Sequence, residues 1–275
     1  IHDRRQRQMC IRDRYINLLT EVMKFAYADR SKYLGDPDFY DVPIKKITSK
    51  KYANDINKNI QIGKSIPVNE INPGKYMDGE SHETTHFSVV DKTGNVISMT
   101  YTLNSTFGSK VVIEGTGILM NNEMDDFSAA PGIPNQFNLL GAEANEIAPF
   151  KRPLSSMTPT IVLKDKELFF TTGSPGGARI ISAVLQSIVN IIDFNMNLED
   201  TTAAKRIHHQ WYPDILEYEF TLDNTIEKNL KKMGYKTESK LPLTCLQTIM
   251  FTDGMYYGYG DFRRVDALAS GNIND

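Results

Sequence analysis

Two short segments of alternating polarity, separated by a turn, begin at Thr84 and constrain the fold more than any other feature. Apolar and polar side chains alternate over residues 84–90 and 96–103, with Asp91-Lys92-Thr93-Gly94-Asn95 between them. A period of two residues places one face of a strand in a core, and a short glycine-containing turn joins antiparallel neighbours. We therefore predict a β-hairpin that begins at or just before Thr84.

A second hairpin with a helix directly behind it points to the same fold class. Residues 160–164 and 167–172 frame a two-residue turn, and a glycine-rich turn at 173–177 leads into an apolar helix expected over 178–194. Hairpins interspersed with helices favour an α+β fold, in which helices cover antiparallel sheets, over a doubly wound parallel sheet. Other helices are expected at 15–30, within 48–60, near 198–206 and near 224–233, and other strands at 111–120, 248–251 and 255–259.

Residues 1–14 differ in character from the residues that follow. They crowd arginines without an apolar period, whereas an amphipathic helix is expected from Tyr15, with its apolar face formed by Ile16, Leu19, Val22, Met23 and Ala26. We interpret 1–14 as a non-native segment or a disordered basic arm, outside the fold.

Composition excludes several classes of protein. The 275 residues carry a formal net charge of -3, so no whole-chain basic field favours nucleic acid. No run of about 18 apolar residues predicts a membrane-spanning helix. Cys10 and Cys245 are the only cysteines, too few for a disulfide framework or a C-x-x-C site.

Three polar segments could carry chemistry. The turn at 173–177 precedes a helix, where the N–H groups of Gly176 and Gly177 favour an anion or the oxyanion of acyl transfer, although a plain tight turn is the alternative. The pair Ser155-Ser156 is either a hydroxyl pair that binds a ligand or an ordinary turn. Residues 121–126 are acidic but lack the calcium-loop pattern, so an ammonium-binding carboxylate is favoured over a metal.

The order of five motifs identifies a family. The motifs are Thr84-Thr85-His86-Phe87-Ser88-Val89-Val90-Asp91, Thr100-Tyr101-Thr102-Leu103-Asn104 and the segments 121–127, 151–159 and 172–177. Together they resemble the small subunit of γ-glutamyltranspeptidase, and 26–30 and 33–39 resemble the end of that family's large subunit. The resemblance implies an N-terminal-nucleophile hydrolase fold of four layers, αββα, N-terminally incomplete here. It assigns 15–83 to the large subunit and 84–275 to the small, catalytic subunit.

The same resemblance implies a mechanism without cofactor or metal. Autocatalytic cleavage at Glu83–Thr84 would make Thr84 a new N-terminus, whose α-amino group serves as the base for its own hydroxyl. Thr102 would hydrogen-bond this nucleophile, and Gly176 and Gly177 would hold the oxyanion. The uncut chain would be an inactive zymogen.

The resemblance also implies what binds. The substrate would be glutathione or another γ-glutamyl compound, and the acceptor water, an amino acid or a dipeptide. The glutamyl α-amino group would meet Asp126, with Asn104 and Glu123 nearby, and its α-carboxylate would meet Ser155 and Ser156. Large and small subunits, cut from one precursor, would form a heterodimer, and a periplasmic, secreted or cell-surface location is expected.

Two departures from the family pattern bear on activity. The family's large subunit adds an Arg for the α-carboxylate from a region upstream of Ile1, so we expect this chain alone to be inactive. Residues 131–142 match the family's lid loop over the substrate. Phe137 stands where many bacterial members have a Tyr, whose hydroxyl forms a hydrogen bond with the Asn that corresponds to Asn104. The alternatives are an amidase that resembles cephalosporin or glutaryl acylases, an amidase that processes poly-γ-glutamate, and an inert, unprocessed fragment.

Overall fold

The computed structural model describes residues 2–71, 84–128, 130, 133–242 and 244–271, and for residues 2–11 it describes the backbone alone. The chain divides into two compact units, each assembled from separate stretches of sequence. The first unit contains residues 1–80, 124–155 and 207–241, and the second contains 81–123, 156–206 and 242–275.

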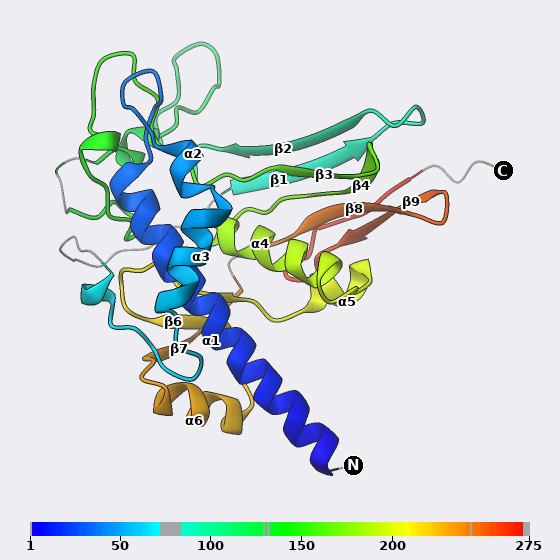
Figure 1. Cartoon of the computed structure of the whole chain (residues 1–275). Helices are drawn as coiled ribbons and strands as arrows, with labels where there is room; N and C mark the ends of the chain where they lie inside the picture. The colour runs from blue at the N-terminus through cyan, green and yellow to red at the C-terminus, as the bar shows by residue number, and fades with distance from the viewer. Residues whose placement is uncertain (1, 72–83, 129, 131–132, 243, 272–275) are drawn as a thin grey trace. The chain divides into compact units, whose positions relative to one another are not determined.

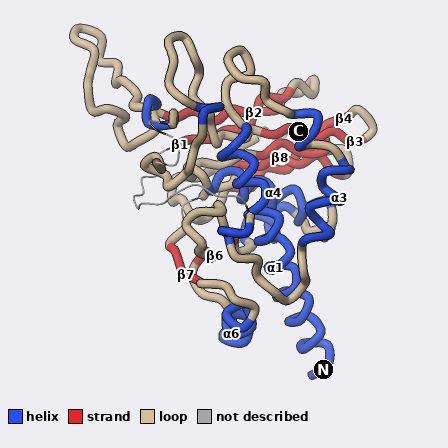
Figure 2. Tube along the Cα trace, turned by 60° about the vertical axis from the view of Figure 1, so that its left-hand side comes forward, coloured by secondary structure: helices blue, strands red, loops and turns tan. Residues whose placement is uncertain are grey.

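The second unit stacks two antiparallel sheets (Figures 1 and 2). One is the hairpin β1 (Thr84–Val90) and β2 (Val96–Thr102), in which Thr84 pairs with Thr102. The other has four strands in the order β3-β4-β8-β9, with bounds Thr160–Lys164, Glu167–Thr172, Gln247–Thr252 and Met255–Gly260. Both predicted hairpins and the two closing strands are confirmed.

Helices α4 (Arg179–Ile192) and α5 (Leu198–Ala203) cover the four-stranded sheet. Phe170 and Met250 of the sheet pack with Ile191 and Leu198 of the helices in one buried cluster. Burial of this apolar surface holds the sheet and the helices together. The α+β class is confirmed.

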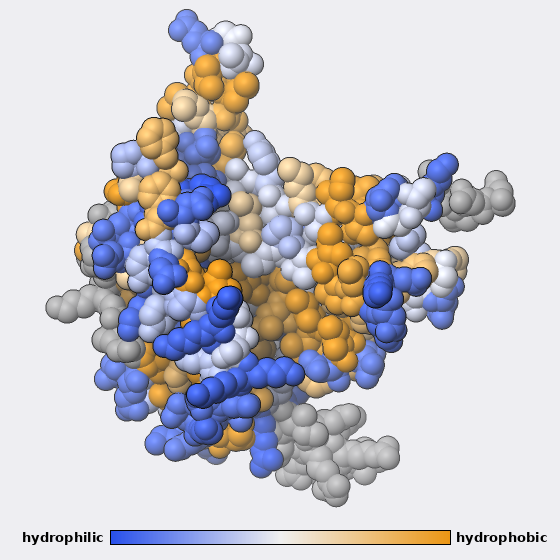
Figure 3. Space-filling view, turned by 45° about the horizontal axis from the view of Figure 1, so that its top comes forward, coloured by the Kyte–Doolittle hydropathy of each residue, from blue (hydrophilic) through white to orange (hydrophobic). Residues whose placement is uncertain are grey.

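The outer face of the β1–β2 hairpin is apolar and open. Its alternate side chains on this face are Phe87, Val89, Ile97, Met99 and Tyr101, each between 43% and 60% exposed. Figure 3 looks onto the side that β2 occupies in Figure 1 and shows apolar surface there. A patch of this kind normally marks a surface that another element covers.

The first unit contains the long helix α1 (His2–Tyr33) and a small mixed sheet. Its strands are β5 (Ile207–His208), β6 (Leu216–Glu219) and β7 (Thr237–Lys240), and α6 (Asn224–Lys232) connects the parallel pair β6–β7. The shorter helices of this unit are α2 (Ile44–Ile47) and α3 (Lys50–Asn59), and its 3-10 turns are η1 (Val68–Glu70) and η3 (Glu143–Asn145). A further 3-10 turn, η2 (Glu123–Asp126), lies where the chain leaves the second unit.

Three sequence predictions are corrected. Helix α1 continues through residues 2–14, and Asp13 is buried and accepts a hydrogen bond from Asn229 Nδ2 at 2.6 Å, so the helix expected from Tyr15 begins earlier. Val22, which was predicted to lie on the apolar face of this helix, is 39% exposed. The strand expected over 111–120 is a tight loop, because Gly115 and Gly117 adopt φ of 76° and 71° and leave a single bridge.

Helix length and polarity decide whether a helix could cross a membrane. Within the described residues, each helix is too short or too polar to span a bilayer.

Candidate active site

Thr84 is the first residue of β1, and its hydroxyl is held by the neighbouring strand. Its Oγ1 donates to Thr102 Oγ1 at 3.2 Å, and Thr102 Oγ1 also accepts the backbone N–H of Asn104 at 2.8 Å. Thr84 is only 9% exposed. The strand register therefore brings the two predicted threonines together and orients the lone pairs of the Thr84 hydroxyl.

Asn104 follows β2 in a left-handed conformation. Its φ of 74° is one that Asn tolerates better than most residues, and its side-chain amide donates to Asn122 O at 3.1 Å. Asn122 N–H in turn donates to Leu103 O at 3.1 Å. Asn104 is thus a buried, fixed residue two positions beyond the partner of Thr84.

The glycine turn after β4 begins directly against β1. A Cβ on Gly173 would overlap the ring of His86, so only glycine fits at this position. Ser174 Oγ donates to Pro175 O at 2.6 Å and accepts Cys245 N–H at 2.9 Å, which ties the turn to the segment before β8. Hydrogen bonds of Ser174 therefore hold the turn against the segment that leads into β8.

Gly176 and Gly177 have the geometry expected of an anion site. Their φ angles are 133° and 55°, in the region that favours glycine, and α4 begins two residues later. No acceptor among the described residues pairs with either N–H group. Free N–H groups at a helix start can stabilise developing negative charge.

His86 lies two residues from Thr84, on the same buried face of β1. Its Nδ1 hydrogen-bonds Thr100 Oγ1 at 2.8 Å, and its Nε2 contacts Ser88 Oγ at 3.2 Å. Burial lowers the pKa of His86 to about 4, because the imidazolium loses its hydration. His86 is therefore neutral at physiological pH and supports the strand rather than supplying charge.

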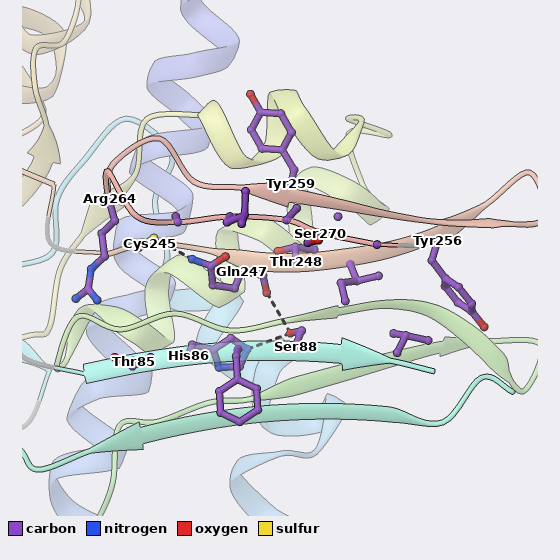
Figure 4. Close-up of a pocket in the computed structure, with 18 of the residues that line it drawn as sticks. Thr85, His86, Ser88, Cys245, Gln247, Thr248, Tyr256, Tyr259, Arg264 and Ser270 are labelled. Carbon is purple, nitrogen blue, oxygen red and sulfur yellow. Dashed lines mark hydrogen bonds between the residues drawn. The ribbon is translucent and has the colours of Figure 1, made fainter. Parts of the chain in front are cut away.

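A groove of about 1080 Å³ runs along β1 between the two sheets (Figure 4). Thr85, Gln247, Tyr259 and Arg264 are among its lining residues. Figure 4 shows the Arg264 side chain reaching from the turn after β9 toward the end of β1 that carries Thr85. Arg264 Nη2 donates to the carbonyl oxygen of Thr84 at 3.2 Å.

The residues predicted to bind the glutamyl group are divided between the units. Glu123 and Ser156 belong to the second unit, together with Thr84, and both are half-buried. Asp126 and Ser155 belong to the first unit. The predicted grouping of these four side chains around one ligand stays a prediction.

Asp126 and Phe137 are each anchored within the first unit. Asn145 Nδ2 donates to Asp126 O at 2.7 Å, and the Arg30 guanidinium lies within electrostatic reach of the Asp126 carboxylate. Phe137 is half-buried, and Gln210 Nε2 donates to its carbonyl oxygen at 2.8 Å. Glu83, on one side of the predicted cleavage, and Pro131, at the start of the predicted lid, lie outside the described residues.

Sequence reasoning missed His86 and Arg264 as parts of this site. The period of two could have placed His86 beside Thr84, whereas Arg264 is 180 residues away and carries no local signal. Among the described residues, no group of three or more His, Cys, Asp or Glu side chains is arranged to hold a metal ion.

Comparisons with known proteins agree on one family. The family model for gamma-glutamyltranspeptidase matches residues 3–271. The glutathione hydrolase proenzyme of Escherichia coli (strain K12) is 51% identical over 257 residues, which are 93% of this chain and 44% of that protein. The chain therefore spans about half the length of this curated relative.

Two solved structures extend the comparison. Gamma-glutamyltranspeptidase from Pseudomonas nitroreducens, complexed with L-DON, is 42% identical with a TM-score of 0.65, over 70% of this chain and 100% of that chain. Cephalosporin acylase from Bacillus halodurans is 25% identical with a TM-score of 0.73, over 90% of this chain and 43% of that chain. With the α+β architecture and the family model in agreement, the fold is that of the N-terminal-nucleophile hydrolases, and the chain belongs to the gamma-glutamyltranspeptidase family.

Proposed function

We propose that the full-length protein cleaves itself before Thr84 and then transfers γ-glutamyl groups through that residue. The observation that carries this proposal is the hydrogen bond from Thr84 Oγ1 to Thr102 Oγ1, which holds the hydroxyl of the first residue of β1 in one orientation. A threonine hydroxyl at the start of a strand is well placed to become an N-terminal nucleophile.

Scission needs only groups of the chain and one water molecule. Thr84 Oγ attacks the carbonyl carbon of Glu83, the hydroxyl proton passes to the amide nitrogen, the C–N bond breaks, and the nitrogen leaves as the Thr84 amine. Water then hydrolyses the resulting ester, which frees the Glu83 carboxylate and restores the Thr84 hydroxyl. A free α-amino group has a pKa of about 7.7 to 8.0, so part of it is unprotonated near neutral pH and can act as a base.

Transfer would follow the same path with an external substrate. The freed amine takes the Thr84 hydroxyl proton while Oγ attacks the γ-carbonyl of glutathione or a related compound. The N–H groups of Gly176 and Gly177 stabilise the oxyanion, and the amine returns the proton to the departing nitrogen. Water, an amino acid or a dipeptide then takes the γ-glutamyl group from Thr84.

Selectivity for a free glutamyl end would come from opposite charges at two ends of the pocket. Asp126, with Asn104 and Glu123, would receive the α-ammonium group, and Ser155 and Ser156 would donate to the α-carboxylate. Phe137 would cover the ligand by packing alone. A lid residue without a hydroxyl forgoes a hydrogen bond, which is worth about 0.5 to 1.5 kcal/mol.

Three observations support processing into a heterodimer. The match covers the whole of the Pseudomonas nitroreducens chain but only 70% of this chain. A separate polypeptide that begins near Thr84 would give this share. The apolar outer face of the β1–β2 hairpin also suits a covering partner. The E. coli relative is named a proenzyme.

An acylase is the second candidate, because the Bacillus halodurans acylase matches over 90% of this chain. Such amidases do not require an ammonium group on the substrate, whereas the half-buried Asp126 carboxylate favours one.

The experiment uses the purified full-length protein. Gel electrophoresis and mass spectrometry should find a fragment that begins at Thr84, and γ-glutamyl anilide should be hydrolysed much faster than glutaryl anilide, which lacks the amine. A protein that stays whole would contradict the proposal, and a preference for glutaryl anilide would favour the acylase.

A further inference from the structure

We propose that Arg264 is a positioning residue for Thr84, both in scission and in γ-glutamyl transfer. The inference rests on the proposed function, because it assigns a role beside the same nucleophile. It begins from the hydrogen bond of 3.2 Å between Arg264 Nη2 and the Thr84 carbonyl oxygen.

The turn that carries Arg264 is firmly anchored. Asp261 is fully buried and accepts Arg206 Nη2 at 2.7 Å, Arg263 Nη1 at 3.0 Å and Leu246 N–H at 2.9 Å. Arg264 N–H donates to Asp261 O at 3.2 Å, which closes the turn. The guanidinium of Arg264 therefore extends from a support that has little freedom to move.

Holding the Thr84 carbonyl fixes the nucleophile from its other side. The Thr84 hydroxyl is held by Thr102, and the carbonyl is held by Arg264. With both groups fixed, rotation about the bonds to Cα is restricted, so the nitrogen and Oγ keep one mutual geometry. Small misplacements of reacting atoms can cost about 100-fold in rate.

Among the described residues, Arg264 brings a positive charge to Thr84, whose nitrogen scission frees. Neither β2 nor β8, the strands that contact β1, carries a charged side chain. His86 on β1 is neutral above about pH 4, since burial lowers its pKa, and burial raises the pKa of the Cys245 thiol to about 11. The other ionisable groups that the structure describes around the Arg264 turn include Asp261, Arg263 and Asp266 of the turn and Arg206, which pairs with Asp261.

A cation close to the Thr84 amine disfavours its protonated form, and so keeps more of it available as a base near neutral pH. Removal of the Arg264 charge should therefore move the acidic limb of kcat/KM to higher pH. A merely structural residue would not produce this shift.

The test uses the full-length protein with three substitutions. Arg264→Gln removes the charge, Arg264→Lys keeps it, and Lys166→Gln removes an exposed charge from the β3–β4 turn as the matched control. The readouts are the half-time of cleavage, kcat and KM for γ-glutamyl anilide, the pH profile, and the melting temperature.

Arg264→Gln should lower kcat by about 10- to 100-fold, change KM less than threefold, slow cleavage, and shift the acidic limb upward. Arg264→Lys should restore the acidic limb and part of kcat, and Lys166→Gln should match the wild type. If Arg264→Gln is not cleaved at all, the cleavage half-time of Arg264→Lys is compared with that of the wild type. Cleavage of the Lys variant would then support the proposal.

The inference would be overturned if Arg264→Gln had the wild-type kcat and pH profile. It would also fail if Arg264→Lys were as impaired as Arg264→Gln and both losses followed the melting temperature. A wild-type protein that neither cleaves itself nor hydrolyses the anilide would instead contradict the proposed function.

Discussion

Two regions of the molecule bury polar groups in different ways, one around Lys24 in the first unit and one around Thr84 in the second. In the first unit a charged cluster is buried: Lys24 Nζ donates to Glu21 Oε1 at 2.9 Å, to Ser65 Oγ at 2.7 Å and to Ile66 O at 2.9 Å. Around Thr84 in the second unit, the hydrogen bonds on the face of β1 run through hydroxyls and the neutral imidazole of His86.

The difference separates structural from chemical use of polarity. A buried charge is tolerated only when it is fully paired, and Lys24 uses all three of its donors, while Glu21 also accepts Tyr235 OH at 2.6 Å and Ile66 N–H at 3.2 Å. Neutral hydroxyls can hold a nucleophile without placing a charge beside it. The first region should therefore respond to mutation in stability, and the second in rate.

The largest expected effect is on the charged cluster. Lys24→Met leaves Glu21 buried without its cation, which should lower the free energy of unfolding by about 3 to 5 kcal/mol in urea titrations. The double variant Glu21→Leu, Lys24→Met removes both charges and should recover most of this loss. Equal losses in the single and double variants would show that the ion pair is not what makes the single change costly.

The second effect concerns the hydroxyl beside Thr84. Thr102→Val removes the acceptor for both Thr84 Oγ1 and Asn104 N–H, so kcat of the full-length protein should fall by about 10- to 100-fold. Thr102→Ser keeps the hydroxyl and should stay within a few-fold of the wild type. Anilide hydrolysis measures both, and an unaffected Val variant would remove Thr102 from the site.

The smallest effect is the acid sensitivity of His86. Its folded pKa of about 4 lies below the unfolded value of about 6.5, so the unfolded state binds the proton first. The stability that the neutral ring contributes is complete above pH 6.5 and is lost as the pH falls toward 4. His86→Gln should flatten the decline of the urea midpoint across this window. Part of the slope should remain, because burial also lowers the pKa of His209 in the first unit.

These regions also differ in how well the sequence predicts them. The β1–β2 hairpin and the glycine turn follow from local signals, a period of two and a run of glycines between a strand and a helix, whereas the Thr84–Thr102 pair was predicted from the family resemblance. The contact of Arg264 with Thr84 depends on tertiary folding across 180 residues, so no local pattern indicates it.

The first unit was harder to predict for a related reason. Glu21 and Lys24 interrupt the apolar period of α1, and charged residues on a helix are normally solvated, although here both are fully buried. The parallel pair β6–β7 consists of four-residue strands, too short for a clear period. The roles of Asp126, Ser155 and Phe137 come from the family resemblance alone and stay predictions.

The most direct test of the central claim is the mass of the chains formed by the full-length protein with and without the Thr84 hydroxyl. The wild type should yield two chains, one of which begins at Thr84, and Thr84→Ala should stay whole and lack γ-glutamyl transfer. A Thr84→Ala protein that is still cut before residue 84, or that keeps the wild-type turnover, would contradict the account.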